Sequence, residues 1–279
     1  MAGELFGFDA FSPHEVAGRI ETIGVAKANL PLRSMFMLAL LAGGFIGLGS
    51  IAFLLVASDA AMSFAASRIL GGAVFSLGLM MVVVAGAELF TGNNLLAMAW
   101  AEGRVGTRAL LRNWTVVGLG NLVGAGGLAL LVLLADTASV NGGLLARKAV
   151  ELAAAKAALS WDVAFVRGVL CNVLVCLAVW MAAAGRSVVD KTVAIVPPIT
   201  AFVALGYEHS IANMFFFPLA IGLIAGDPAL AALPGAGAVG WTAMAKNLIP
   251  VIAGNLVGGS VLVALVYWVI YRVGDSRRA

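Results

Sequence analysis

The chain has 279 residues, of which 62% are hydrophobic and only 11% are charged. A soluble domain usually carries charge on about a quarter of its residues, so this composition excludes a water-soluble protein. The net charge is +3, but the basic residues are scattered between apolar blocks and are not gathered on one face. This distribution argues against nucleic-acid binding and predicts an integral membrane protein whose basic residues report its topology.

Residues 1–33 precede the first long apolar block and contain four acidic side chains. They lack the basic start and apolar core of a signal peptide. Ser12 and Pro13, followed by Glu15, are typical of a helix start. Apolar residues from Val16 and Ile20 to Ile23 and Val25 then predict a short amphipathic helix on the membrane surface. We expect residues 1–33 to form a cytoplasmic N-terminal segment.

Six apolar blocks follow, and a bilayer core about 30 Å thick requires about 20 helical residues for each crossing. Four blocks have the length of one crossing, namely residues 34–57, 113–135, 165–184 and 247–271. The other two, residues 69–101 and 192–226, are too long for one crossing and too short for two. A helix interrupted at mid-membrane fits both. The sequence therefore predicts an all-α integral membrane protein with six transmembrane helices, the second and fifth of them broken.

An even number of crossings leaves both chain ends on one side of the membrane. With that side cytoplasmic, eleven Lys and Arg residues lie inside and six lie outside. The positive-inside rule therefore predicts that both termini are cytoplasmic, with residues 272–279 as a cytoplasmic tail.

The chain also repeats itself. The motif Gly-Asn-Leu-Val-Gly at residues 120–124 recurs 134 residues later, at residues 254–258. The spacing Glu-x-x-x-x-Asn, which begins at Glu88, recurs 120 residues later from Glu208. Three spans per repeat place the two halves in opposite orientations, so residues 34–135 and 161–271 are predicted to form an inverted 3+3 repeat. Broken helices at matching positions of such a repeat indicate a transport site near the bilayer midplane.

Three ionisable side chains, Glu88, Glu208 and His209, lie inside the long blocks, and such groups are functional candidates by default. Free N–H groups at a helix start favour an anion. For the two glutamates we favour a structural role, in which they accept hydrogen bonds from the interrupted backbone. For His209 we favour a place in the pore, and Thr91 lies in the other break, where its hydroxyl can donate a hydrogen bond.

Other classes of protein fit less well. An intramembrane enzyme would need a nucleophile or a metal set, and the spans contain no His, Cys and Asp cluster with ligand spacing, so we expect neither enzyme activity, nor metal, nor cofactor. A structural or receptor protein would not need two matched, glutamate-bearing breaks. Cys171 and Cys176 lie five residues apart on different faces of one helix and are expected to be inert thiols.

Three motifs carry a resemblance to a known family. Residues 86–92 (GAELFTG), 171–181 (CNVLVCLAVWM) and 206–214 (GYEHSIANM) resemble signature segments of the formate/nitrite transporter family. Residues 185–191 and 247–271 look like the formate-channel branch in particular. One departure is the pair Asn93 and Asn94, where formate channels often carry smaller or apolar residues.

This resemblance implies an aquaporin-like fold, a homopentamer with one pore per protomer, and a place in the bacterial inner membrane. It implies formate and similar small monovalent anions as substrates, with nitrite or hydrosulfide as the alternative. The residues that it implies around the pore are Thr91, His209, Lys156, Asn172, Glu208 and Asn213. The residues that it implies at apolar constrictions are Phe75, Leu79, Leu89, Phe90 and Phe202.

Protons are the second expected partner. A carboxylate that crosses an apolar constriction must lose its water at a cost of at least several kcal/mol, whereas the neutral acid loses much less. We therefore hypothesise that His209, which titrates nearest neutral pH, passes a proton to the anion. In the rival hypothesis His209 offers a fixed hydrogen bond and the anion itself permeates.

Overall fold

The structure, a computed structural model, describes residues 10–273. The outer parts of the predicted N-terminal segment and tail, residues 1–9 and 274–279, lie outside the described residues. The first half of the chain contains the helices α1 (Pro13–Ala28), α2 (Leu32–Ala57), α3 (Phe64–Phe75), α4 (Leu77–Met81), the π-helical η1 (Val82–Gly86), the 3-10 helix η2 (Gly92–Leu95), α5 (Leu96–Ala101) and α6 (Thr107–Leu134).

The second half begins after a short 3-10 helix, η3 (Thr137–Ser139). Its helices are α7 (Leu144–Ala157), α8 (Trp161–Ala184), α9 (Val188–Ala204), α10 (Ser210–Gly226), α11 (Pro228–Ala231), η4 (Ala236–Ala238) and α12 (Trp241–Leu256). The last helix continues without interruption through η5 (Val257–Leu265), α13 (Val266–Trp268) and η6 (Val269–Val273).

Five helical segments of the described chain are long and apolar enough to cross a membrane, namely Leu32–Ala57, Phe64–Gly86, Thr107–Leu134, Trp161–Ala184 and Trp241–Val273. The remaining crossing consists of α9 and α10, each 17 residues long and separated by a break at residues 205–209. A matching break at residues 87–91 ends the segment that begins at Phe64. The predicted interruptions of the second and fifth crossings are thus confirmed.

A glycine with left-handed backbone lies near the start of each break. Gly86 has φ +84° and Gly206 has φ +73°, which is left-handed backbone that side chains with a Cβ adopt at a cost. The two glycines are 120 residues apart, the same offset as Glu88 and Glu208. The breaks are therefore built into the backbone at equivalent places in the two halves.

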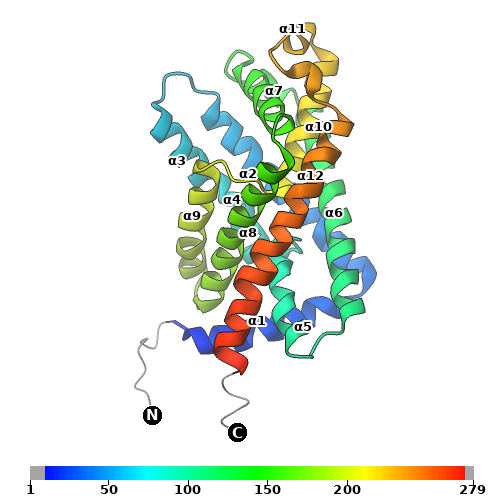
Figure 1. The fold of residues 1–279 in the computed structure, drawn as a ribbon. Helices are drawn as coiled ribbons and strands as arrows, with labels where there is room; N and C mark the ends of the chain where they lie inside the picture. Colours follow the sequence, from blue (N-terminus) through cyan, green and yellow to red (C-terminus); the bar gives the residue numbers. More distant parts are fainter. Residues whose placement is uncertain (1–9, 274–279) are drawn as a thin grey trace.

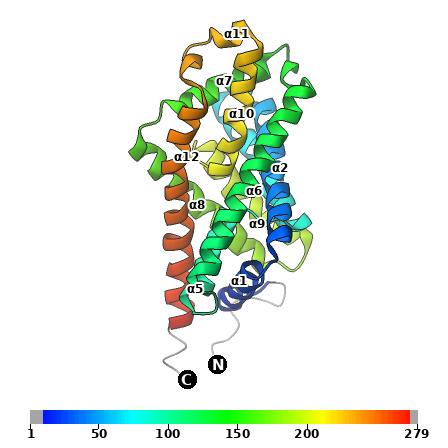
Figure 2. The ribbon, with the colours of Figure 1, turned by 90° about the vertical axis from the view of Figure 1, so that its right-hand side faces the viewer.

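The two halves run in opposite directions (Figures 1 and 2). Helix α6 rises from the end that holds α1 and α5 toward the end that holds α7 and α11, whereas α12 descends between the same two ends. We refer to these as the α1 end and the α7 end. Within each half two long helices pack closely, α2 against α6 and α8 against α12.

Helix α1 begins as the sequence predicted, because Ser12 and Glu15 form a reciprocal capping box. Part of its apolar stripe, however, is buried against the rest of the protein. Val16 and Ile20 are buried in a cluster with residues of α5 and α8. Glu21 is fully buried and accepts hydrogen bonds from Arg272 Nε at 2.8 Å and Arg104 Nη1 at 3.4 Å.

Burial raises the pKa of the Glu21 carboxyl, and Arg272 opposes that rise. A carboxylate is retained in such a position only when cations compensate for its lost hydration. The two arginines come from distant parts of the chain, so Glu21 anchors α1 to the α1 end of the bundle.

Candidate functional site

The two helix breaks meet at Thr91 and His209. Thr91 Oγ1 lies 3.0 Å from His209 Nε2, and both residues are buried. The other ring nitrogen, Nδ1, accepts a hydrogen bond from the Ala212 amide at 3.1 Å and so caps the start of α10. Because Nδ1 accepts, Nε2 carries the proton of the neutral ring and donates to Thr91 Oγ1. The Thr91 hydroxyl can then donate a hydrogen bond to a third group.

A polar cluster lies behind His209. Lys156 Nζ donates to Glu208 Oε1 at 2.8 Å, and the other carboxylate oxygen accepts from Asn213 Nδ2 at 2.7 Å. Asn213 Nδ2 also donates to Asn247 Oδ1 at 2.7 Å, and Asn247 Nδ2 donates to the Lys156 carbonyl at 3.1 Å. All four side chains are buried. The ring of contacts neutralises Glu208 with Lys156, and we call these four residues the α7-side cluster.

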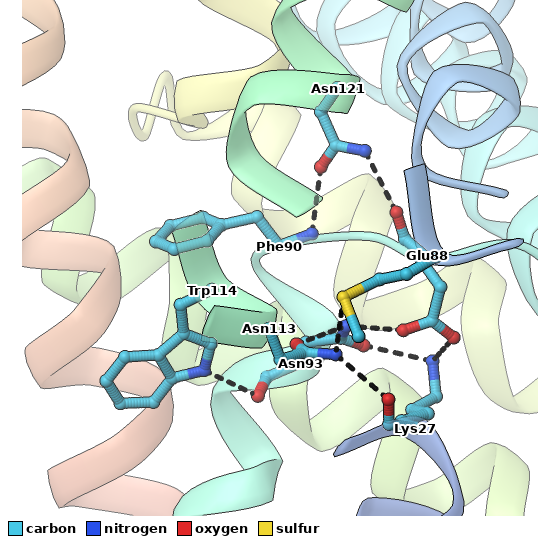
Figure 3. A network of polar contacts seen from close by, with 8 residues as sticks. Lys27, Glu88, Phe90, Asn93, Asn113, Trp114 and Asn121 are labelled. Atoms are coloured by element: carbon cyan, nitrogen blue, oxygen red, sulfur yellow. Dashed lines mark hydrogen bonds and ion pairs between the residues drawn. The ribbon is translucent and has the colours of Figure 1, made fainter. Parts of the chain in front are cut away.

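The first break carries the same cluster (Figure 3). Lys27 Nζ donates to Glu88 Oε1 at 2.7 Å and to Asn93 Oδ1 at 2.9 Å. Asn93 Nδ2 donates to Glu88 Oε2 at 2.7 Å and to Asn113 Oδ1 at 3.0 Å, while Asn113 contacts the Lys27 carbonyl at 3.3 Å. We call these residues the α1-side cluster.

The two clusters are related by the repeat. The third crossing of each half, α6 or α12, carries a further asparagine, Asn121 or Asn255, which holds the broken backbone. Its side-chain NH₂ donates to the carbonyl of the glutamate, and its side-chain oxygen accepts from the backbone N–H two residues after the glutamate. Each glutamate N–H in turn donates to the first helix of its own half, to Leu38 O or Arg167 O at 3.2 Å. The equivalent residues are Lys27 and Lys156, Glu88 and Glu208, Asn93 and Asn213, Asn113 and Asn247, and Asn121 and Asn255.

Lys27 is the functional candidate that sequence reasoning missed. It lies 129 residues before Lys156, on a helix outside the predicted spans, where no shared motif marks the equivalence. The only available signal was the glutamate of the first break, which needs a cation just as Glu208 does. The structure also supports a structural role for both glutamates, because each carboxylate holds its own break through a lysine and an asparagine.

Two cavities approach the Thr91–His209 contact from opposite ends of the molecule. The α1-side cavity has a volume of about 460 Å³, and Lys27, Leu79 and Leu89 are among its lining residues. The α7-side cavity, of about 200 Å³, is lined by Lys156 and His209 among others.

The predicted constriction residues divide between these cavities. Phe75 and Phe202 line the α7-side cavity, with their rings edge to face at 5.6 Å, and the Phe202 ring lies 5.8 Å from that of His209. Leu79 and Leu89 line the α1-side cavity. Phe90 lines neither cavity, and its ring points away from Lys27 and Glu88 in Figure 3.

The hydrogen bonds of Asn172 support the backbone around Thr91. Its Nδ2 donates to Thr91 O at 3.2 Å, Asn94 Oδ1 at 2.8 Å and Asn255 O at 2.7 Å. Cys176 Sγ also donates to Thr91 O, at 3.3 Å. Asn94, one of the two residues that departed from the formate-channel pattern, thus joins the first break to the second half of the chain.

Residues 10–273 contain no group of three or more His, Cys, Asp or Glu side chains that could hold a metal ion. Cys171 and Cys176 are buried and free, as the helical spacing predicted. The site is therefore a hydrogen-bonding pair between two cavities, with a neutralised lysine–glutamate cluster beside each break.

Comparisons with known proteins agree with this architecture. The sequence pattern of the family described as formate/nitrite transporter matches residues 14–269. The chain is 38% identical over 281 aligned residues to the formate channel FocA of Escherichia coli, covering 95% of both chains. It is also 38% identical to a probable formate transporter of Methanothermobacter thermautotrophicus, over 93% of this chain and 97% of that one.

Solved structures show the same fold. A pentameric formate channel with formate bound superposes with a TM-score of 0.80 at 39% identity, over 86% of this chain and 97% of that chain. An ion channel of the same family gives a TM-score of 0.80 at 29% identity, over 92% and 98%. These relatives are transporters and channels, not enzymes, and they identify the present chain as a multi-pass membrane protein. The chain belongs to the formate/nitrite transporter family.

Proposed function

We propose that this protein is a formate channel in which the Thr91–His209 pair forms the central station of the pathway. The observation that carries the proposal is the 3.0 Å contact between these two side chains, made where both helix breaks meet and where cavities approach from both ends. A carboxylate at this point would accept a hydrogen bond from the Thr91 hydroxyl. The names of the FocA relative and the formate-bound structural relative support formate as the substrate.

The pathway is asymmetric in its apolar lining. Phe75 and Phe202 narrow the approach from the α7 side, and Leu79 and Leu89 narrow the approach from the α1 side. Apolar constrictions exclude hydrated ions. A small anion of formate's size passes only after it has exchanged its water for hydrogen bonds from the protein, and the central pair supplies them.

The contacts of His209 favour a fixed hydrogen bond over proton transfer. To act as an acid, the ring must carry a second proton on Nδ1, but this atom accepts the Ala212 amide at 3.1 Å. The start of α10 also carries partial positive charge, which disfavours an imidazolium. His209 is therefore a neutral donor in this arrangement, and the proton-coupled alternative requires the ring to leave its cap.

We further propose that the α1 end is cytoplasmic and that the protein is a homopentamer. The excess of Lys and Arg on the side of both termini supports the orientation, and the pentameric relative supports the assembly. Native mass spectrometry in mild detergent is expected to show five copies. A dimer or trimer as the sole species would contradict this assembly.

The direct test of the function is uptake into proteoliposomes. Purified protein is expected to accelerate formate entry well above protein-free vesicles, and to transport chloride and lactate much more slowly. Nitrite and hydrosulfide belong in the same experiment, because they share the size and charge of formate. A faster rate for either of these would assign the alternative substrate, and no acceleration for any anion would reject the channel.

Replacing Lys156 with alanine is expected to reduce formate uptake about tenfold or more while the protein still assembles. The substitution leaves Glu208 with an uncompensated charge beside the pathway, and an unpaired buried carboxylate is strongly unfavourable and repels an anion. Adding Glu208→Gln to Lys156→Ala removes that charge and is expected to restore a substantial part of the flux. Lys148→Ala serves as the control, because Lys148 pairs with the partly exposed Glu151 away from the second break. Uptake by Lys156→Ala equal to that of the control would contradict the role of the cluster.

A further inference from the structure

Arg68 lies at the junction between the α7-side cavity and a wider hollow of about 670 Å³ beyond it. Its Nε donates to the carbonyl of Ala204, the last residue of α9, at 2.8 Å. This bond orients the guanidinium, and its two terminal nitrogens make no hydrogen bond or ion pair within residues 10–273. A Cβ at Gly206 would lie only 2.8 Å from one of these nitrogens, so the loop that leads to His209 passes directly beneath the guanidinium.

Arg167 is the second guanidinium of the α7-side cavity. Its carbonyl already accepts the Glu208 amide at 3.2 Å, so its backbone is held against the second break. Within residues 10–273, no carboxylate lies within 4 Å of the charged nitrogens of either Arg68 or Arg167. We call these two residues the arginine pair.

The lysine of the same cavity does not supply free positive charge. Lys156 Nζ is bound to Glu208 at 2.8 Å, so the α7-side cluster is close to neutral. Among the Lys and Arg side chains that line the α7-side cavity, the two arginines are therefore the ones whose positive charge can attract an anion. Guanidinium groups offer N–H donors in a planar fork that matches a carboxylate, and they pair with it more specifically than an ammonium does.

The positions equivalent to Arg68 and Arg167 in the repeat do not carry arginine. The residue 129 positions before Arg167 is Leu38, which lines the α1-side cavity with an apolar side chain. The residue 120 positions after Arg68 is Val188, which is exposed and does not line that cavity. The α1-side cavity is lined instead by Arg19 and Lys191, which are not at equivalent positions of the repeat. The two ends therefore share the lysine–glutamate cluster and differ in where their other basic side chains lie.

We infer that the arginine pair is a carboxylate-binding site at the α7-side mouth, where a small monocarboxylate is held before it reaches His209. This inference rests on the proposed function and extends it by naming a loading site that serves one face of the channel. The half-saturating formate concentration measured from the α7 side depends on the arginine pair, whereas the value measured from the α1 side does not.

The test measures the half-saturating formate concentration separately from each face, in right-side-out and inverted membrane vesicles. Arg167→Gln is expected to raise the value from the α7 side about three- to tenfold and to leave the value from the α1 side unchanged. Arg167→Lys, which keeps the charge but loses the fork, is expected to give an intermediate value. Arg68→Lys is the matched variant at the other position, because an ammonium can still reach the end of α9.

The control is Arg147→Gln. Arg147 lines the wider hollow but pairs with Glu151 at 2.9 Å, so its loss changes the surface charge without touching the α7-side cavity. Half-saturation of Arg167→Gln equal to that of this control from both faces would overturn the inference, as would an equal rise from both faces. Failure of the unsubstituted protein to transport formate at all would instead reject the proposed function.

Discussion

Replacing His209 with asparagine is expected to lower formate flux about ten- to a hundredfold and to leave the shape of its pH dependence unchanged. The asparagine oxygen can still accept the Ala212 amide and cap α10, so folding should survive. What disappears is the Nε2 donor that orients Thr91 Oγ1 at 3.0 Å. A hydrogen bond to a charged partner contributes about 1.5–3 kcal/mol, and each 1.4 kcal/mol or so is a factor of ten in rate.

The same experiment separates the two mechanisms. Flux should be measured with a pH-sensitive dye and, in planar bilayers, as current. If His209 transfers a proton, the His209→Asn variant would lose the pH-dependent step of transport, or it would carry formate as an anion and show a new electrical current. Thr91→Val, which keeps the shape of the side chain but removes the hydroxyl, is expected to reduce flux to a similar extent, and Thr91→Ser should restore it. Full flux in His209→Asn with unaltered pH dependence would remove the histidine from the mechanism altogether.

Replacing Gly124 with alanine is expected to prevent correct folding. An added Cβ would lie 2.0 Å from the carbonyl oxygen of Leu40 and 3.1 Å from the amide of Gly44, both of them backbone atoms of α2. Neither atom can move without separating α2 from α6. That separation would also strain the 2.7 Å bond from Asn121 to Ala39 O, one turn away, which helps to hold the first break.

Overpacking of this kind costs about 3 kcal/mol or more when backbone must shift. The measurements are the yield of monodisperse protein in detergent and its Tm. Gly118→Ala is the matched control on the same helix, because its Cβ would meet only the Phe90 ring at an ordinary distance of 3.8 Å. Gly258→Ala, at the equivalent place in the second half, would lie 2.2 Å from Val169 O and should fail in the same way. Normal assembly of Gly124→Ala would show that the two helices can separate freely.

Much of the architecture follows from local properties of the chain. A hydrophobic block of about 20 residues crosses the bilayer whatever its neighbours are, because the bilayer itself is the solvent that selects it. The two overlong blocks and their glutamates therefore predicted the breaks at residues 87–91 and 205–209 directly. The repeated asparagines at Asn121 and Asn255 predicted an inverted pair of halves, and in the structure they hold the two breaks in the same manner.

The contacts across the molecule required the tertiary structure. Lys27 reaches Glu88 over 61 residues of sequence from a helix outside the spans, so no local pattern connects them. Asn172 was expected around the pore, and the structure shows that it donates to the Thr91 carbonyl from a neighbouring helix. The direction of the Phe90 ring depends on how α6 packs against the first break, and adjacent residues of a loop give no indication of it.

The sequence by itself determined how many times the chain crosses the membrane, where two of the crossings are interrupted, and which titratable groups lie at the interruptions. These properties depend on hydropathy, length and spacing, all of which are local. Only the tertiary structure decided which cation neutralises each glutamate, which nitrogen of His209 faces Thr91, and which guanidinium groups remain without a carboxylate. Those outcomes depend on distances between residues far apart in the chain, and packing alone sets such distances.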